Sequence, residues 1–411
     1  MTSSTLSRGA AMRALLSLAI GSFGIGMTEF VMMGLLPNVA AELLPSAWAA
    51  NPDDAIAQAG VLISLYALGV VIGAPTIAGS VARFPRHRVM IVLALALTVF
   101  NLLTVIAPTY ELVAASRLLA GLPHGAYFGI GALVAADVLG PGNRAKGVAF
   151  VLTGLTVANV VGVPLGTLLG QQFGWRFAFL AVGGVFALST LAIMLFVPEH
   201  PGVPGRRLRD ELKVFKVGQV WFALGIGAVG FGGFFAMYSY IAPMVTDLAG
   251  SPEWAVSIVL VVVGLGMTVG NIVGGHLADA NLKKWLPIGL VAMAIACALL
   301  ALTAGWVVTL GIFAFAIGFV GAALSPAIQT RLMDVAGDNQ SIAAALNHSA
   351  LNMGNSLGAF LGGVVIALGL GFAAPAWVGV ALALGGLGVA LLSFRFEKTP
   401  VAAEPEPAAV A

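Results

Sequence analysis

Long apolar segments alternate with short polar loops along almost the whole chain. A helix needs about 20 predominantly apolar residues to cross a bilayer, and by that measure the pattern of the 411 residues predicts twelve spanning helices. The predicted segments are 13–36, 59–82, 88–107, 110–135, 145–168, 175–197, 217–241, 254–278, 285–304, 306–330, 341–367 and 372–394.

The composition agrees with this pattern. Hydrophobic residues make up 60% of the chain and charged residues only 9%, whereas a soluble domain carries about 25% charged residues. The sequence therefore predicts an all-α membrane protein. The first segment follows Arg8 and Arg13 as a signal peptide would, but it is too long for a signal h-region and is interpreted as a spanning helix. Cys297 is the single cysteine, so no intrachain disulfide can form.

The basic residues predict the orientation in the membrane. Every lysine and arginine except Arg117 and Arg176 falls at the segment ends or in the loops and tails on one side, which the positive-inside rule assigns to the cytoplasm. Both termini are therefore predicted to be cytoplasmic. The loops predicted to face outside carry mainly acidic residues, namely Glu42, Asp53, Asp54, Glu111, Asp247 and Glu253.

A polar stretch divides the helices into two groups of six. It predicts a linker at 198–216, more consistent with a basic segment at the membrane surface than with a partner-docking helix. The predicted organisation is a cytoplasmic N-terminus at 1–12, six-helix bundles at 13–197 and 217–396, and a disordered cytoplasmic tail at 397–411.

The two halves repeat one another. A shift of 196 residues places Gly79 on Gly275, Arg88 on Lys284, Asn159 on Asn355, Gly162 on Gly358 and Gly166 on Gly362. Small residues recur at every fourth position in the fifth and eleventh segments, which allows helices to approach closely. Such ridges suit either close packing alone or a surface on which the two halves rock against each other.

Glu29 is an acidic residue inside the first apolar segment, and such a residue is a functional candidate. It lies roughly 12 Å from the outer end of its helix, at a depth similar to that of Arg117 in the fourth segment, so the sequence allows an ion pair. Burial favours a neutral carboxyl group and a nearby guanidinium favours the charged form, so movement between conformations can change proton affinity. A static pair that only joins two helices is the alternative.

Five stretches resemble the major facilitator superfamily, specifically its twelve-helix drug/proton antiporters of the chloramphenicol-resistance and arabinose-exporter group. They are GMTEFVMMGLLPNVA at 26–40, RLLAGLPHGAYFGIG at 117–131, GLTVANVVGVPLGTLLGQQFGWRFAF at 154–179, and the pair IAPMVTDLAG at 241–250 and GGHLADANLKK at 274–284. The resemblance implies two six-helix bundles, and proton coupling through Glu29 and Arg117.

The resemblance also indicates which residues take part in the conformational change. The third stretch is similar to the fifth-helix antiporter motif and contains Pro164. In the second half, Asp279 with Lys283 and Lys284 keeps the family's acidic and basic loop pattern, whereas the first copy has Arg83 in place of the aspartate. We therefore expect the charged contacts that hold the two halves together on the cytoplasmic side to differ in the first half, with Arg86 or Arg88 pairing with Asp137 or Asp334.

A substrate cavity is expected between the halves. His124 lies on the same helical face as Arg117, where it serves either a proton relay or packing. His348, Asn352 and Asn355 form a polar face of the eleventh helix, and a metal site there is not expected. The resemblance implies that the seventh-helix aromatics line this cavity, although lipid-facing aromatics would show the same spacing. The further predicted substrate contacts are these aromatics and scattered methionine, tyrosine and amide side chains, namely Phe231, Phe234, Phe235, Tyr238, Met33, Asn101, Tyr240 and Gln329.

These features predict a proton-coupled exporter of a small, moderately apolar molecule such as chloramphenicol, with a sugar or nucleoside exporter as the alternative. A transport-dead sensor, a scaffold or a channel is a further alternative. The sequence carries no phosphate-binding loop, dinucleotide fingerprint or nucleophile constellation, so neither an enzyme nor a cofactor is expected. The expected partners are the substrate, protons and lipid, with no nucleic acid, for a monomer in the bacterial inner membrane.

Overall fold

The computed structural model describes residues 7–81, 84–140, 144–199, 212–336 and 340–397, which are almost entirely helical and contain no strand. The first half comprises α1 (Arg8–Gly34), α2 (Leu36–Leu43), α3 (Pro45–Ala50), α4 (Pro52–Val81), α5 (Arg86–Ile106), α6 (Tyr110–Leu139), α7 (Arg144–Val157), η1 (Ala158–Gly162), α8 (Val163–Phe173) and α9 (Trp175–Phe196). The second half comprises η2 (Leu212–Lys216), α11 (Gly218–Gly225), η3 (Ile226–Gly230), α12 (Gly232–Tyr238), α13 (Ile241–Pro243), η4 (Met244–Leu248), α14 (Trp254–Thr303), α15 (Val307–Ala336), α16 (Gln340–Ala367) and α17 (Ala374–Arg395).

Eleven of the described helical stretches are long and apolar enough to cross a membrane. One of them, α14, is 50 residues long and contains Asn281 with non-helical backbone angles (φ −166°, ψ 89°). The Asn281 side chain accepts a hydrogen bond from the Lys284 backbone N–H at 3.1 Å, which caps the helix that follows. Since α14 is thus two spanning segments joined by a kink, the prediction of twelve helices is confirmed.

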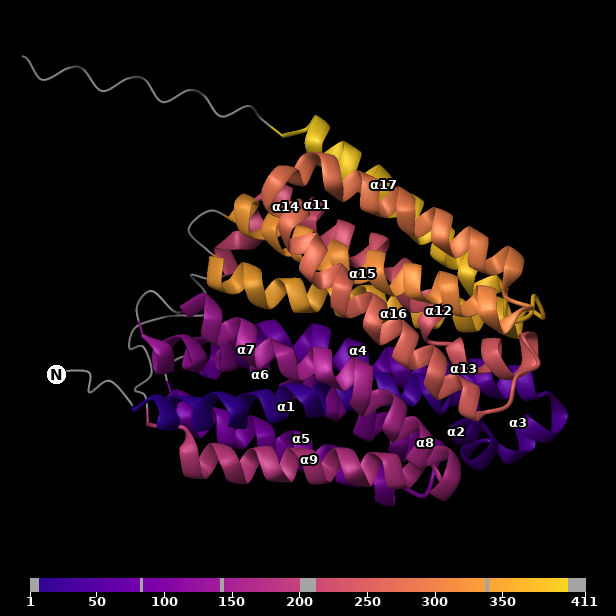
Figure 1. Ribbon diagram of the computed structural model, residues 1–411, viewed down its shortest axis with the longest axis horizontal. Coiled ribbons are helices and arrows are strands. Elements are labelled where there is room, and N and C mark those ends of the chain that lie inside the picture. The colour runs from indigo at the N-terminus through magenta and orange to yellow at the C-terminus, as the bar shows by residue number, and fades with distance from the viewer. Residues whose placement is uncertain (1–6, 82–83, 141–143, 200–211, 337–339, 398–411) are drawn as a thin grey trace, which may run out of the picture.

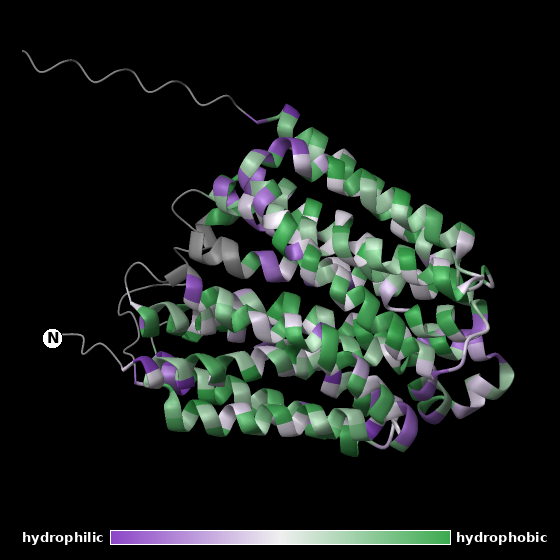
Figure 2. Ribbon diagram, viewed as in Figure 1, coloured by the Kyte–Doolittle hydropathy of each residue, from purple (hydrophilic) through white to green (hydrophobic). Residues whose placement is uncertain are grey.

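The helices form two bundles that lie side by side (Figure 1). The first residues of α1 and the last residues of α17 lie at the same end of the molecule, on the left in Figure 1, and we call this the terminal end. The helices α2, α3 and α13 lie at the opposite end. Hydrophobic residues cover the length of the helices, and hydrophilic residues gather towards the two ends (Figure 2), as expected of a protein that spans a bilayer.

The fifth spanning segment is not a regular α-helix. It runs through α7, η1 and α8, and η1 is a π-helical turn in which Val163 N–H donates to Ala158 C=O. Pro164 follows immediately, and because proline has no N–H, the carbonyl four residues earlier loses its helical partner. Wider turns of this kind are tolerated in a membrane where neighbouring helices pack around them.

The two halves meet tightly at the end opposite the termini. There α4 packs along α16, and α14 packs along η1 and α8. Ser257 of α14 donates a hydrogen bond to Pro164 C=O at 3.2 Å, so Pro164 lies in this contact. Nearby, Gly264 approaches so closely that an added Cβ would lie 2.4 Å from the backbone oxygen of Asn159.

The glycine ridges of the fifth and eleventh segments do not lie between the halves. A Cβ on Gly162 or Gly166 would collide with side chains of α1, and one on Gly358 or Gly362 would collide with α12 or Tyr240 beside it. Each ridge therefore packs against the first helix of its own half. The expectation of a rocking surface on these glycines is wrong, because an alignment of repeats gives their spacing and not the direction in which they point.

We predict that Gly264→Ala weakens the closed contact opposite the termini. The methyl group would crowd a backbone oxygen that cannot rotate away, and overpacking of this kind costs roughly 1–3 kcal/mol. The measurement is the rate at which a water-soluble maleimide labels Ser257→Cys, a buried position in this contact, with the buried Cys297 replaced by alanine. The rate is expected to rise about tenfold.

Gly311→Ala is the matched control, because open space surrounds that position in the same half. Equal labelling rates in the Gly264→Ala and Gly311→Ala proteins would contradict the prediction.

Candidate functional site

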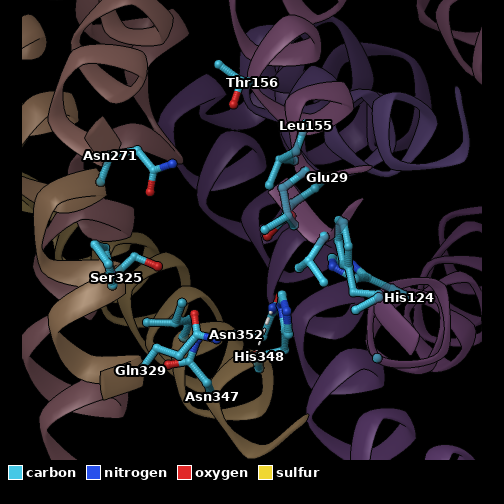
Figure 3. A pocket seen from close by; sticks show the side chains of 18 of the residues that line it. Glu29, His124, Leu155, Thr156, Asn271, Ser325, Gln329, Asn347, His348 and Asn352 are labelled. Atoms are coloured by element: carbon cyan, nitrogen blue, oxygen red, sulfur yellow. Dashed lines mark hydrogen bonds between the residues drawn. The ribbon is translucent and has the colours of Figure 1, made fainter. Parts of the chain in front are cut away.

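A cavity of about 510 Å³ lies between the two halves. Its lining extends from Glu29 in α1 to Val81, Arg86 and Met333 near the terminal end, so it is continuous with that end and closed at the other by the contacts of Gly264 and Ser257. Figure 3 shows side chains of both halves pointing into this space.

The cavity walls differ in chemistry. Phe231, Phe234 and Phe235 of the seventh spanning segment form an apolar wall, and Phe30 of α1 stacks on Phe235 with ring centroids 6.2 Å apart. Polar side chains occupy the other walls, and Figure 3 shows several of them grouped around the space. They are Thr156, Asn159, Thr268, Asn271, Ser325, Gln329, Asn347, His348 and Asn352.

Glu29 lies at the deep end of the cavity and is 7% exposed. Its Oε1 atom accepts a hydrogen bond from Asn355 Nδ2 of α16 at 3.1 Å, so a single polar contact joins the first helix of one half to the eleventh spanning segment of the other. Asn355 itself does not line the cavity but lies directly behind Glu29.

Arg117 does not form the predicted ion pair with Glu29. Instead, its guanidinium donates to Thr28 Oγ1 at 2.9 Å and to Thr28 C=O at 2.8 Å. Successive residues of an α-helix point about 100° apart. Thr28 therefore faces α6 inside its own half while Glu29 faces the cavity, and equal depth along the membrane normal could not reveal this difference.

A chain of aromatic and imidazole rings leads from Arg117 towards the cavity. The guanidinium lies over the ring of Tyr66, 4.3 Å from its centroid, and Tyr66 Oη is hydrogen-bonded to His124 Nδ1 at 2.9 Å. The ring of His348, from the other half, lies 6.5 Å from that of His124 and stacks on Phe128 with centroids 5.1 Å apart. His124 and His348 thus approach each other from the two halves at the cavity wall.

Some predicted substrate contacts line the cavity and others do not. The lining contains Phe231, Phe234, Phe235, Gln329, His348 and Asn352. Asn101 is fully buried elsewhere and accepts a hydrogen bond from Thr28 Oγ1 at 2.5 Å. Met33 and Tyr238 are also fully buried outside the lining, and Tyr238 packs on Phe30.

Tyr240 is likewise absent from the lining. Its hydroxyl donates to Ala359 C=O at 2.7 Å and lies 2.2 Å from the position of a Cβ added to Gly60, so it belongs to the contact between α4 and α16. Its expected role in substrate binding is therefore not supported, because the side chain that looked like a cavity group from sequence closes the opposite end.

Several residues of the site were not predicted from sequence, among them Thr28, Tyr66 and Asn347. Thr28 and Tyr66 hold Arg117, and a buried arginine implies such partners without identifying them. Asn347 lines the cavity beside His348. Five residues separate it from Asn352, which places the two about 140° apart around a helix axis, so no spacing signal in the sequence identified it.

The charged groups at the terminal end pair within each half. Arg86 forms an ion pair with Asp137, one of the two acidic partners anticipated, whereas Arg83 lies outside the described residues. Lys283 pairs with Glu397 at 2.8 Å and not with Asp279, which is exposed and forms no ion pair with any residue in the described ranges. The kink at Asn281 lies between Asp279 and Lys283, so the two side chains do not lie on one continuous helix face and do not meet.

Two helical bundles that enclose a central cavity, open at one end and closed at the other, define a membrane transporter. The Major Facilitator Superfamily profile matches this chain in two overlapping ranges, residues 18–281 and 224–410. The chain therefore belongs to the Major Facilitator Superfamily.

Individual proteins agree with this assignment. The Inner membrane transport protein YdhP of Escherichia coli (strain K12) is 37% identical over 390 residues, which cover 94% of this chain and 96% of YdhP. The Chloramphenicol resistance protein of Streptomyces lividans is 28% identical over 392 residues, covering 94% and 97%. The crystal structure of a D-xylose-proton symporter superposes with a TM-score of 0.74 at 17% identity, covering 94% and 97%.

We predict that Thr28→Val destabilises the first half. The nearly isosteric valine removes the hydroxyl that accepts from Arg117 and donates to Asn101, which leaves two buried polar groups short of a partner. The free energy of unfolding is expected to fall by roughly 1–3 kcal/mol, measured as a lower thermal midpoint of the purified protein.

Thr153→Val provides the control, since the Thr153 hydroxyl is exposed and bonds only to the carbonyl of Phe150 in its own helix. If both variants unfolded at the temperature of the wild-type protein, Thr28 would not be needed to hold Arg117.

Proposed function

We propose that this protein is a secondary transporter that exports a small, moderately apolar molecule in exchange for protons. It works in the bacterial inner membrane, with both termini in the cytoplasm, by exposing the central cavity alternately to the two sides. The names of two relatives support this location and direction, since YdhP is an inner membrane transport protein and the Streptomyces protein is a chloramphenicol resistance protein.

The observation that carries the proposal is the position of Glu29. It lines the cavity, and its hydrogen-bonding partner Asn355 belongs to the opposite half. A hydrogen bond to a charged carboxylate is roughly twice as strong as one between neutral groups. Protonation of Glu29 therefore weakens the contact between α1 and α16, which links the proton to the movement of the halves.

Arg117 and His124 support this coupling without touching Glu29. The buried guanidinium fixes Thr28, the residue before Glu29, and thereby sets the direction in which the carboxyl group points. His124 lies between Tyr66 and the cavity and is the nearest described imidazole to His348 of the other half. Arg117 acts through its position and its charge. His124 is the residue that exchanges protons between the cavity and the chain of contacts formed by Arg117 and Tyr66.

In the proposed transport cycle these contacts form and break in turn. A proton from the outside neutralises Glu29, which removes the cost of burying a charge while the halves reorient to the conformation seen here, with an open terminal end. In this conformation the hydrogen bond from Asn355 favours the charged carboxylate and so promotes release of the proton. Capture of the cytoplasmic substrate in the cavity accompanies release of the proton, and the loaded protein then opens on the other side. The tight contacts of Gly264 and Ser257 are the ones that must separate in that step.

The cavity accepts a molecule with an apolar part, because three phenylalanines line one wall. Chloramphenicol is the first candidate. The amide side chains on the other walls favour a second candidate, a sugar or nucleoside exported by the same coupling. A transporter that needs no cofactor, has no enzymatic activity and works as a monomer remains the prediction from sequence.

The test uses everted membrane vesicles whose interior has been made acidic. Addition of chloramphenicol, arabinose or a nucleoside should release protons from wild-type vesicles, measured by fluorescence of a pH-sensitive dye. Glu29→Gln keeps the size of the side chain but cannot ionise, so the release should fall to the background of vesicles without the protein.

Glu111→Gln is the matched control, because Glu111 is an exposed acidic residue in the first turn of α6 outside the cavity, and it should release protons as the wild type does. Full proton release by Glu29→Gln would show that this carboxyl group is not the coupling site. Saturable substrate flux distinguishes a transporter from a channel.

A further inference from the structure

Several amide oxygens at the cavity are buried and accept no hydrogen bond. They belong to Asn159 of η1 and to Asn347, Asn352 and Asn355 of α16, and no residue in the described ranges donates to them. Asn159, Asn347 and Asn352 line the cavity and are 4%, 2% and 5% exposed. Buried polar atoms are satisfied in most proteins, so a cluster of free acceptors at one cavity indicates that a ligand supplies the donors.

For Asn352 and Asn355, contacts within the protein fix which amide atom is free. Asn352 Nδ2 lies 3.1 Å from the carbonyl oxygen of His348, and only the NH₂ group can donate to that oxygen. The Asn355 NH₂ group is taken by Glu29 in the same way. The oxygen of each amide is therefore the atom left to accept a hydrogen bond.

The amide oxygens of Asn347 and Asn352 lie on one side of the cavity, so the cavity has a polar wall and an apolar wall. Asn347 and Asn352 lie together near Gln329 and His348, with Glu29 and His124 on the neighbouring wall (Figure 3). The apolar wall of Phe231, Phe234 and Phe235 offers no hydrogen-bonding group. A molecule that fills the cavity must therefore present hydrogen-bond donors to the polar wall and apolar surface to the phenylalanine wall.

We propose that the substrate is an uncharged molecule with at least two O–H or N–H donors on one side and a flat apolar face on the other. The donors bind the amide oxygens of Asn347 and Asn352, and the apolar face packs on the phenylalanines. This proposal rests on the proposed function and narrows it, since a purely apolar drug of the same volume is excluded.

The size of the effect follows from the penalty for unpaired buried acceptors. A ligand without donors would displace water from these oxygens and leave them unpaired, and the loss of one such hydrogen bond lowers affinity about tenfold. A site built to bind O–H or N–H groups rejects analogues that lack them far more strongly than a hydrophobic pocket rejects a change in size.

The experiment measures binding to the purified full-length protein by isothermal titration calorimetry, which does not depend on proton coupling. The probes are chloramphenicol and its di-O-acetyl ester, and adenosine and its tri-O-acetyl ester, so that each pair differs mainly in hydroxyl donors. At least one hydroxyl-bearing probe should bind, and its acetylated partner should bind at least about tenfold more weakly.

Variants test whether Asn347 and Asn352 cause the preference for hydroxyl-bearing probes over their acetylated partners. Asn347→Leu and Asn352→Leu should each reduce the affinity ratio within the binding pair by about threefold or more. Gln58→Leu is the matched control, since Gln58 is an exposed amide of α4 outside the cavity lining, and its ratio should stay within about twofold of wild type. A ratio is insensitive to a general loss of stability, so misfolding does not imitate the result.

Three outcomes would overturn the proposal: an acetylated probe that binds as tightly as its partner, no binding of either hydroxyl-bearing probe at about 1 mM, or an equal effect of Gln58→Leu. Proton release in vesicles by a donor-free solute would also overturn it while leaving antiport intact. Donor-dependent binding without proton release would contradict antiport alone.

Discussion

The buried guanidinium of Arg117 is the group on which the arrangement of the first half depends. A charged side chain at this depth is stable only when the protein replaces the water that it lost. Thr28 supplies two acceptors, the ring of Tyr66 lies beneath the cation, and the ring of Phe179 lies 5.1 Å away. These partners come from α1, α4 and α9, so one cation orders four helices including its own.

This order has a consequence for the neighbouring carboxyl group. Because Thr28 is committed to Arg117, α1 cannot rotate without breaking both hydrogen bonds, and Glu29 is held facing the other half. A direct ion pair would neutralise the carboxylate inside its own bundle. The separation instead leaves Glu29 at the cavity, where its state of protonation affects the contact with α16.

The sequence predicted the number of helices well because hydropathy is a one-dimensional signal and the bilayer fixes its length. The spacing of three and four between Phe231, Phe234 and Phe235 identified one side of a helix but not the direction in which that side faces. Their expected place at the cavity came from the family resemblance, and all three line the cavity. The prediction failed for Glu29 with Arg117 and for the glycine ridges. Depth and spacing were correct in both cases, but the direction around the helix axis depends on packing against helices distant in the chain.

The two halves share a scaffold but divide the chemistry. Under the shift that aligns the fifth and eleventh segments, Arg117 falls on Phe313, and the seventh spanning segment contains no acidic residue between Gly218 and Val245. The ionisable group and its support thus belong to the first half, while α16 supplies Asn347, Asn352 and Asn355. Since Asn355 bonds Glu29 one turn away from Asn352, a change at the carboxyl group and a ligand on the amide wall act on the same helix. In the proposed coupling, that shared helix connects a proton bound in one half to a binding surface in the other.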